Sequence, residues 1–442
     1  MKTKFPQFML IVCWLAVAGS LLAQNPTESK LTRPATKFTK ETNQKVLSEL
    51  PFSNTQDFTD AKRGLLLPFN TMIDTNGNIV NSAKPAAWDM AQYAFENTNV
   101  NDTGLTVNPS LWREAQLNNF AGFFEVIPNK VYQVRGFDLS VMTLIMGQDK
   151  GTPCWIAIDP LVTAPTAKAG LGLANQWLTQ NGQAARPVRA VIYTHSHIDH
   201  YGGVLGVTDT NAVNAGICRI YAPKAFLEHA VTENLMAGTA MGRRATYMYG
   251  NILFDKNPKS EVDAGLGKTT SSGPNNIIRP DTTDIIPGWS TIQHPARRTI
   301  CGVNIDFWYT PETEAPAEMM FYFPDWKALC AAELVTHTMH NVYSLRGAAV
   351  RDALSWSGYI NEVMETYGTT IEVLFASHHW PTWGNKNING LLQKQRDLYK
   401  YLNDQTFRLF NQGYTMIEIG ERVVLPDSLG KVWANRPYYG TV

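Results

Sequence analysis

The ten residues Thr194–Gly203 read T-H-S-H-I-D-H-Y-G-G and place four metal-binding side chains within six positions. Neutral imidazoles and carboxylates are ligands that zinc-like ions prefer. In a loop, His195 and His197 can point toward one ion while Asp199 and His200 turn toward a second. Four ligands from one loop cannot easily surround a single ion and still leave a position open for catalysis. The pattern therefore predicts a metal hydrolase, and a two-ion site would need further ligands from elsewhere.

The elements around this cluster place it at the end of a strand. An apolar run over residues 187–194 leads into the cluster, and α/β sheets carry their active sites at the carboxyl ends of such strands. Gly202 and Gly203 allow a tight turn into the segment that follows. The remaining histidines are the candidates for further imidazole ligands, and they are His229, His294, His337, His340, His378 and His379.

Strand-like and helix-like segments alternate along the rest of the chain. Apolar runs predict strands over residues 131–136, 140–147, 154–159, 187–194, 303–310, 318–323 and 371–377. Helical spacing predicts helices over 167–178, 224–250, 349–366 and 390–412, and residues 324–327 predict a hairpin turn. Segment 251–290 is rich in Gly, Asn, Pro and Thr and is expected to be mostly loop. This alternation predicts a layered α/β architecture.

The bulk composition is that of an ordinary folded protein. Among 442 residues, 44% are hydrophobic, 17% are charged, and Lys+Arg and Asp+Glu balance at 38 each. This balance argues against a nucleic-acid-binding surface. Lys2 and Lys4, the apolar run after them and Ala23 predict a signal peptide over residues 1–23, and hence a periplasmic or secreted protein. Nothing later in the chain resembles a membrane span.

Four cysteines remain once the predicted signal peptide, which contains Cys13, is removed. They occupy apolar, strand-like surroundings without C-x-x-C spacing, and they are Cys154, Cys218, Cys301 and Cys330. An exported protein could use them in disulfides, but the sequence favours buried free thiols.

Several motifs carry a resemblance to known families. The cluster after its apolar strand, with I-D-P closing an earlier strand at residues 158–160, resembles the metallo-β-lactamase fold superfamily. The stretches T-E-A-P-A-E-M-M-F-Y-F-P (313–324) and L-C-A-A-E-L-V-T-H-T-M-H-N-V-Y-S-L-R-G-A-A-V-R-D (329–352) resemble, more narrowly, the alkyl sulfatase family of dizinc hydrolases of alkyl sulfate esters. The resemblance implies an αββα sandwich, followed by the start of an all-helical dimerisation domain.

The resemblance also implies a ligand set for two zinc ions. The first ion would be bound by His195, His197 and Glu314, the second by Asp199, His200 and His378, with Glu333 contributing a carboxylate between them. Glu318 is the alternative to Glu314, and His379 the alternative to His378. Asp159 is expected to orient a ligand histidine. His337 and His340 are left outside the set of ligands.

The family pattern further implies how the site would act. Asp199 and Glu333 would activate and position the attacking water, and a sulfate clamp would be formed by Asn341, Arg346 and Arg351. Tyr247 and Tyr249 would reach the head group or serve an ordinary helix face. The run G-L-G-K-T-T (265–270) looks like a phosphate-binding loop, but Val262 stands where that motif requires glycine, so nucleotide binding is rejected.

The same reading divides the chain into four parts. These are the signal peptide (1–23), an N-terminal arm and lead-in (24–130), the catalytic domain (131–400) and the beginning of the helical domain (401–442). Family members are longer, so we expect a truncated or short variant, and a homodimer only if the helical domain is complete. The substrate would be a small amphiphilic sulfate ester. The alternatives are another dizinc hydrolase, acting on a phosphoester, lactone or β-lactam, and an inactive metal-binding fragment.

Overall fold

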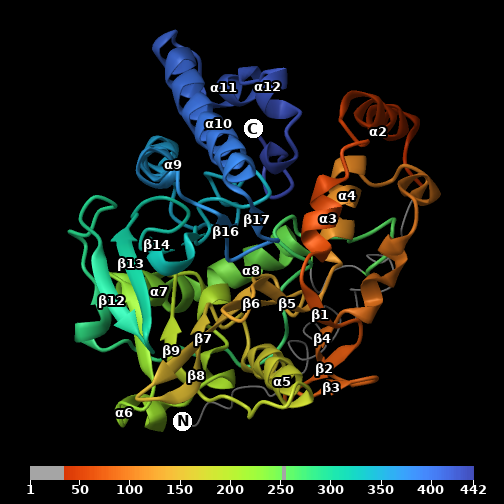
Figure 1. Cartoon of the computed structure of the whole chain (residues 1–442). Helices are drawn as coiled ribbons and strands as arrows, with labels where there is room; N and C mark the ends of the chain where they lie inside the picture. Colours follow the sequence, from red (N-terminus) through yellow and green to blue (C-terminus); the bar gives the residue numbers. More distant parts are fainter. Residues whose placement is uncertain (1–33, 251–254) are drawn as a thin grey trace, which may run out of the picture.

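A computed structural model describes residues 34–250 and 255–442, so the predicted signal peptide lies outside the described part of the chain. Two large sheets dominate it (Figure 1). The first has eight strands, in the spatial order β1 (Leu65–Pro68), β5 (Gly122–Ile127), β6 (Val131–Arg135), β7 (Met142–Asp149), β8 (Thr152–Ile158), β9 (Val188–Ile192), β10 (Arg219–Pro223) and β11 (Ile285–Ile286). The strands from β8 to β11 run parallel, while those before β8 pair antiparallel.

The second sheet has six strands, in the order β12 (Ala296–Ile300), β13 (Val303–Tyr309), β14 (Met319–Phe323), β15 (Ala328–Cys330), β16 (Val373–Phe375) and β17 (Thr382–Trp383). The turn between β14 and β15 falls at residues 324–327, where the sequence predicts a hairpin. A small third sheet holds β2 (Met72–Asp74), β3 (Ile79–Val80) and β4 (Ala86–Asp89).

The two large sheets face each other across an apolar core. Ile145, Ile156 and Ile192 of the first sheet pack with Phe307 and Phe321 of the second. The strands that form this core are apolar on both faces, which is the pattern of strands covered on both sides. Burial of such surface is the main stabilising term in folding.

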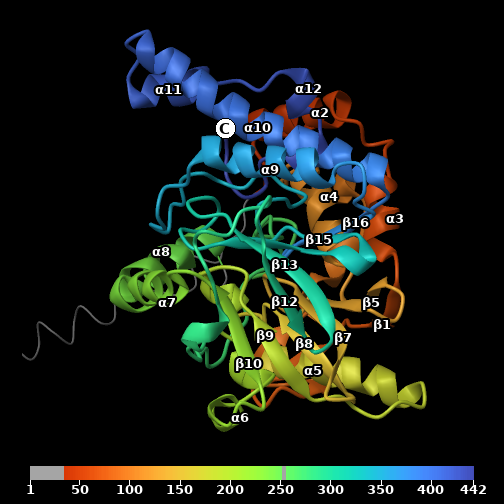
Figure 2. The same cartoon turned by 60° about the vertical axis from the view of Figure 1, so that its left-hand side comes forward.

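Helices cover the outer faces of both sheets. Helix α5 (Ala164–Gln180) packs its apolar side on the first sheet, and helices α9 (Ala353–Tyr367) and α10 (Asn385–Asn411) pack on the second. Figure 2 shows α9 and α10 at the top, α5 at the bottom and the sheets between them. The predicted αββα sandwich is confirmed, and a helical region follows it at the C-terminal end.

Smaller helices complete the described chain. On the N-terminal side they are α2 (Lys37–Glu49), α3 (Gln56–Lys62) and α4 (Pro109–Asn118); beyond the first sheet they are α6 (Thr210–Asn214), α7 (Phe226–Val231), the π-helical turn η6 (Thr232–Met236) and α8 (Gly238–Tyr249); at the C-terminal end they are α11 (Met416–Arg422) and α12 (Asp427–Gly430). None of the helices in residues 34–250 and 255–442 combines the length and apolarity needed to cross a bilayer.

Two predicted boundaries do not coincide with breaks in the fold. Strands β1 and β5 lie before residue 131 and yet hydrogen-bond into the first sheet, so the lead-in is part of the sandwich. Helix α10 runs through residue 401 without interruption. After α12 the chain returns to the sandwich, where Tyr439 forms a β-bridge with His340. The segment assigned to a separate helical domain therefore also packs against the catalytic layers.

A candidate metal centre and its pocket

Asp159 organises the loop that carries the histidine cluster. It follows β8, is fully buried, and has a positive φ of 52°. One carboxylate oxygen accepts a hydrogen bond from the Thr194 amide at 2.9 Å. The other oxygen accepts from the hydroxyls of Thr194 at 2.7 Å and Ser377 at 2.6 Å, and it lies 3.0 Å from Nδ1 of His200. Asp159 thus ties the loops after β8, β9 and β16 together and orients the His200 ring.

The loop presents its imidazoles to carboxylates from the second sheet. Nε2 of His195 lies 3.3 Å from Glu314 and 3.3 Å from Glu333. Nδ1 of His197 lies 2.7 Å from the same oxygen of Glu314. Glu314 stands in the loop between β13 and β14, and Glu333 follows β15. Segments distant in sequence therefore meet at one end of the sandwich.

A second group lies beside the first. Nε2 of His200 is 3.1 Å from Asp199 and 3.3 Å from Glu333. Nε2 of His378, in the loop after β16, is 3.5 Å from Asp199 and 3.4 Å from Glu333. The site thus contains two sets of candidate ligands, and the donor atoms within each set lie within 4.8 Å of one another. One set is His195, His197, Glu314 and Glu333, and the other is Asp199, His200 and His378.

The protonation pattern of these rings suits metal binding. Nδ1 of His378 lies 3.1 Å from the carbonyl oxygens of Leu139 and Leu266, which only accept, so this nitrogen carries the proton and Nε2 presents a lone pair. Five buried atoms of the site have no hydrogen-bond partner among the described residues: Nε2 of His195, His197, His200 and His378, and Oε2 of Glu314. Buried polar atoms are normally paired. Cations held by the two sets would satisfy all five.

The charges around the site keep its carboxylates ionised. Burial raises the pKa of Glu333, but the imidazoles around it, His378 above all, outweigh this effect and hold that pKa well below its usual range. Burial and Glu333 likewise oppose the ionisation of Glu314, and His197 and Arg351 overcome them. Ionised carboxylates beside imidazole rings are the ligand chemistry of zinc-like ions.

The structure distinguishes Glu314 from the alternative Glu318. Glu318 accepts hydrogen bonds from the amides of Ala315 and Glu333, both at 3.1 Å, and from the Thr313 hydroxyl at 2.9 Å. It is buried, which together with Glu314 raises its pKa to about 8. Glu318 therefore holds the loops that carry Glu314 and Glu333, and Glu314 is the residue that faces the histidines.

The two adjacent histidines also separate. His378 faces Asp199 and Glu333, whereas Nε2 of His379 lies 3.0 Å from the carbonyl of Gly265 and 3.2 Å from Glu114. His337 stacks on Trp380, with ring centroids 4.4 Å apart, away from the carboxylates. His340, left out of the ligand set by the sequence, lies 3.1 Å from Glu333 and 3.4 Å from Glu314 through Nε2.

A pocket of about 390 Å³ opens beside the second group of ligands. Asp199 and Arg346 line it, together with Tyr249 and Met241 of α8. One guanidinium nitrogen of Arg346 donates to Glu233 at 2.8 Å, and its Nε is buried without a partner. Tyr249 shares a hydrogen bond of 2.5 Å with the hydroxyl of Tyr439. Arg346 and Tyr249 are thus the predicted substrate-binding residues that the structure brings to the pocket.

The other three predicted substrate-binding residues lie elsewhere. Arg351 donates to the Glu314 carboxylate at 2.5 Å and to the Asn341 side chain at 2.6 Å, so its guanidinium braces Glu314 and does not line the pocket. The Asn341 amide donates to the Tyr439 carbonyl at 3.0 Å. Tyr247 projects from α8 and is 78% exposed. In this structure Arg351 supports Glu314, Asn341 supports the C-terminal segment, and Tyr247 faces solvent, so none of the three takes the predicted place in the pocket.

Comparison with known proteins agrees with this architecture. The family model described as the metallo-beta-lactamase superfamily matches residues 150–297. The chain is 46% identical to a linear primary-alkylsulfatase from Pseudomonas sp over 99% of its length, and 42% identical to an (R)-specific secondary-alkylsulfatase from Pseudomonas sp over 96%. The solved structure of the stereoselective inverting sec-alkylsulfatase Pisa1 from Pseudomonas sp. superposes with a TM-score of 0.84 at 41% identity, over 93% of this chain.

Over most of its length, the chain is therefore homologous to alkylsulfatases. It spans 61% of the primary-alkylsulfatase, 60% of the secondary-alkylsulfatase and 61% of the Pisa1 chain. The described residues include both groups of candidate metal ligands.

Two residues beside the candidate ligands and the pocket were not predicted from the sequence. Glu233, in the π-helical turn η6, lies 3.4 Å from Nε2 of His197 and pairs with Arg346, so it joins a candidate ligand to the pocket. Tyr439, near the far end of the chain, hydrogen-bonds and stacks with Tyr249 of the pocket wall. A single glutamate and a single tyrosine carry no spacing signal, and only the η6 turn and the returning C-terminal segment place them here.

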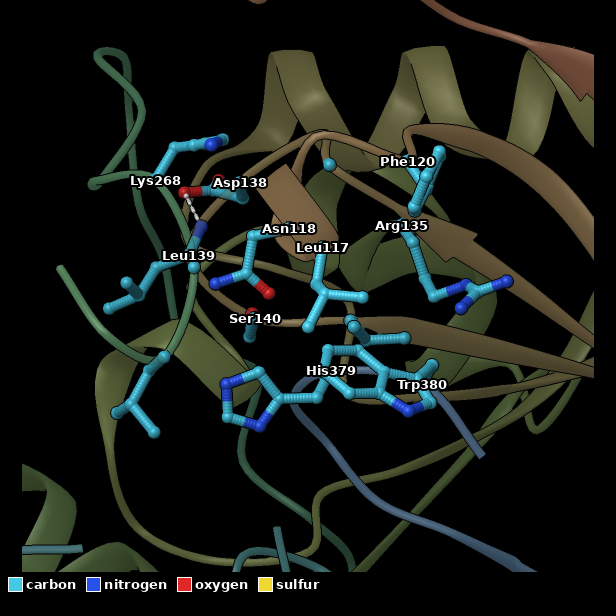
Figure 3. A pocket seen from close by; sticks show the side chains of 14 residues that line it. Leu117, Asn118, Phe120, Arg135, Asp138, Leu139, Ser140, Lys268, His379 and Trp380 are labelled. Carbon is cyan, nitrogen blue, oxygen red and sulfur yellow. Dashed lines mark hydrogen bonds between the residues drawn. The ribbon is translucent and has the colours of Figure 1, made fainter. Parts of the chain in front are cut away.

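A second, small cavity of about 30 Å³ has His379 and Trp380 in its wall (Figure 3). The G-L-G-K-T-T run contributes Leu266, Gly267 and Lys268 to its wall. Lys268 is buried, pairs with Glu96, and donates to the carbonyl of Ala115 at 2.6 Å. Its charge is therefore already compensated within the fold, which agrees with the rejection of a phosphate-binding loop.

Proposed function

We propose that this chain hydrolyses alkyl sulfate esters to inorganic sulfate and an alcohol, using two zinc ions. The observation that carries the proposal is that Asp199 of the second ligand group and the Arg346 guanidinium line the same pocket. A cation centre beside a fixed guanidinium suits an anionic ester better than a neutral substrate. The names of the related alkylsulfatases support the same substrate class.

The two ligand groups would hold the metals. His195, His197 and Glu314 would bind one ion, the group of Asp199, His200 and His378 would bind the other, and Glu333, which faces histidines of both groups, would lie between them. Bound zinc supplies Lewis acidity that makes a water molecule a nucleophile near neutral pH. Asp199 and Glu333 offer ionised oxygens beside which that water can be oriented.

Arg346 would bind the sulfate head group. Burial lowers its pKa, whereas Tyr249, Tyr439 and the Glu233 carboxylate raise it, and the net shift is upward, so it stays charged. Glu233 accepts a hydrogen bond from one terminal nitrogen of the Arg346 guanidinium, while Nε of Arg346 has no partner among the described residues. A planar guanidinium gives paired hydrogen bonds to an oxyanion, which a lysine cannot reproduce.

The rest of the pocket would take the alkyl chain. Its wall includes five apolar side chains, namely Leu139, Val162, Ile198, Met241 and Ala245. Binding sites for amphiphilic molecules combine such apolar lining with a few fixed polar groups. The arrangement supports an ester with a polar head at Arg346 and an apolar tail along α8.

The test is direct measurement of both products. The zinc-loaded chain is incubated with dodecyl sulfate, and released sulfate and dodecanol are quantified, with the Glu333→Ala variant as control. Equimolar sulfate and dodecanol above the control would support the proposal. A zinc-loaded, folded chain that releases neither product faster than Glu333→Ala would refute it.

We also propose that the chain acts outside the cytoplasm, from the signal-peptide pattern over residues 1–23. Expression in a bacterium followed by fractionation should recover the processed chain outside the cytoplasm, and a variant lacking residues 2–23 should stay inside. The homodimer is likewise a proposal, carried by the helical C-terminal region, and sedimentation at several concentrations would test it.

A further inference from the structure

Two cysteines from different sheets lie against each other. Cys154 stands in β8, and Cys301 stands in the turn between β12 and β13. Cys154 is the cross-strand partner of Gly147 in β7, so its side chain and the Cβ position of Gly147 share one face of the sheet. A Cβ built on Gly147 would lie 2.8 Å from Cβ of Cys301. Cys301 therefore occupies the space beside Cys154 that a side chain at residue 147 would fill.

Backbone contacts fix this arrangement. The amide of Gln148 donates to the carbonyl of Cys301 at 2.7 Å and holds the turn against β7. The two thiols also interact: a hydrogen bond from Cys301 lowers the pKa of Cys154 against the opposing effect of burial, and the same bond and burial raise the pKa of Cys301. Both the backbone and the sulfur atoms place the side chains in contact.

The pair differs in access to solvent. Cys154 is fully buried, whereas Cys301 is partly exposed and lines a groove of about 510 Å³. Lys130 and Arg186 lie in the same groove. An anionic thiol reagent can therefore reach Cys301 but not Cys154 directly.

We propose that Cys154 and Cys301 form a disulfide that joins the two sheets when the folded chain meets a small disulfide oxidant such as glutathione disulfide. The Cys301 thiol loses its proton to solvent, and the thiolate attacks one sulfur of the oxidant and releases one glutathione thiolate. The Cys154 thiol then loses its proton, and its thiolate attacks the Cys301 sulfur and releases the second glutathione. Two protein thiols are oxidised, and one disulfide is reduced to two thiols.

The bond suits the fold in two ways. A disulfide requires Cβ atoms about 3.5–4.5 Å apart, and Cys301 lies against Gly147, the cross-strand partner of Cys154. The bond would close a loop of roughly 150 residues, which restricts the unfolded chain more than a short loop would. Cys330, buried in β15, provides a matched thiol outside the pair.

Peptide mapping of the full chain tests the proposal without any variant. The folded protein is equilibrated with reduced and oxidised glutathione, unfolded in the presence of an alkylating reagent, digested without reduction and analysed by mass spectrometry. We expect one linked pair of peptides containing Cys154 and Cys301, with Cys218 and Cys330 alkylated. Alkylation of both Cys154 and Cys301, or a bond from either to Cys218 or Cys330, would overturn the proposal.

Thermal unfolding gives a second, independent measurement. The oxidised protein should unfold on the order of 5 °C above the reduced protein, because the linked chain loses less conformational entropy on folding. Cys330→Ala should keep this difference and Cys301→Ser should abolish it. Equal midpoints for the oxidised and reduced wild-type protein would contradict a stabilising link between the sheets.

Discussion

At the scale of single residues, the chemistry rests on the direction in which side chains point. Arg346 and Arg351 are close in sequence, but one lines the pocket and the other is bound to Glu314 and Asn341. Spacing in a loop does not define these directions, so the sequence could name both arginines and could not separate their roles. The histidine cluster, by contrast, consists of residue types that are typical metal ligands, so a metal-binding role could be predicted from the sequence.

Arg346→Ala should lower kcat/KM for dodecyl sulfate about 10- to 100-fold, because a charged hydrogen-bond donor to the anionic head is lost. Arg346→Lys should restore little of it, since a lysine cannot present the same fork. Steady-state kinetics at fixed zinc content measures the effect. Arg243, an exposed arginine of α8, provides the matched control, and Arg243→Ala should behave like wild type. Equal kinetics for Arg346→Ala and Arg243→Ala would remove Arg346 from substrate binding.

His337 should make stability depend on pH. Burial lowers its pKa to about 4, so the unfolded chain binds its proton more readily. Its stabilising contribution is therefore complete above the unfolded pKa of about 6.5 and is lost as the pH falls toward 4. His337→Phe keeps the stacking on Trp380 and removes the titration.

Urea unfolding of the metal-free protein at pH 7 and pH 5 measures this effect. Between pH 7 and pH 5, the free energy of unfolding of the wild type should fall by up to about 2 kcal/mol more than that of His337→Phe. Partial exposure of the ring reduces this difference. The same loss in both proteins would show that His337 is not the titrating group.

At the scale of elements, the long apolar strands were predictable and the short ones were not. Strand β1 has four residues at the edge of the first sheet, and its pairing with β5 is irregular, so it carries little periodic signal. Helix α9 begins at Ala353, four residues later than expected, because the Asp352 side chain accepts hydrogen bonds from the amides of Leu354 and Ser355. Local polar contacts of this kind decide where elements end.

The turn after the histidine cluster requires glycine at residue 203. A Cβ there would lie 2.0 Å from the carbonyl oxygen of Pro160 and 2.7 Å from that of Thr163. Gly203→Ala should therefore destabilise the fold by about 3 kcal/mol and weaken zinc binding, because backbone atoms must move. Urea unfolding and zinc titration would measure both effects.

Gly172→Ala in α5 is the control for this substitution. No atom lies within 4 Å of the added methyl group, so alanine should be neutral or stabilise the helix by up to about 1 kcal/mol. A Gly203→Ala protein as stable as Gly172→Ala would mean that the loop after β9 tolerates a shift.

At the scale of the whole molecule, the site exists because both sheets end there. The ligands come from the loops after β9, β13, β15 and β16, and the C-terminal segment supplies Tyr439. A layered α/β architecture followed from the alternation of strands and helices, and the αββα sandwich followed from the family resemblance. The return of the C-terminal segment did not, because it depends on contacts between residues about 100 positions apart, such as Asn341 with Tyr439.

Metal removal should weaken the whole fold. Three carboxylates, the buried Glu314 and Glu333 and the partly buried Asp199, would then face one another with fewer positive charges between them. An ion bound only by the folded chain would also no longer stabilise it. A chelator should lower the thermal midpoint by about 10 °C, and added zinc should restore it. An unchanged midpoint after complete removal of metal would argue against a structural contribution from the site.

The most direct test of a two-zinc sulfate-ester hydrolase is a zinc titration of the metal-free chain with sulfate release from dodecyl sulfate as the readout. Release should rise with added zinc and level off near two ions per chain, while Glu333→Ala at the same zinc content stays near background. A chain that holds two zinc ions and releases no more sulfate than Glu333→Ala would contradict the account.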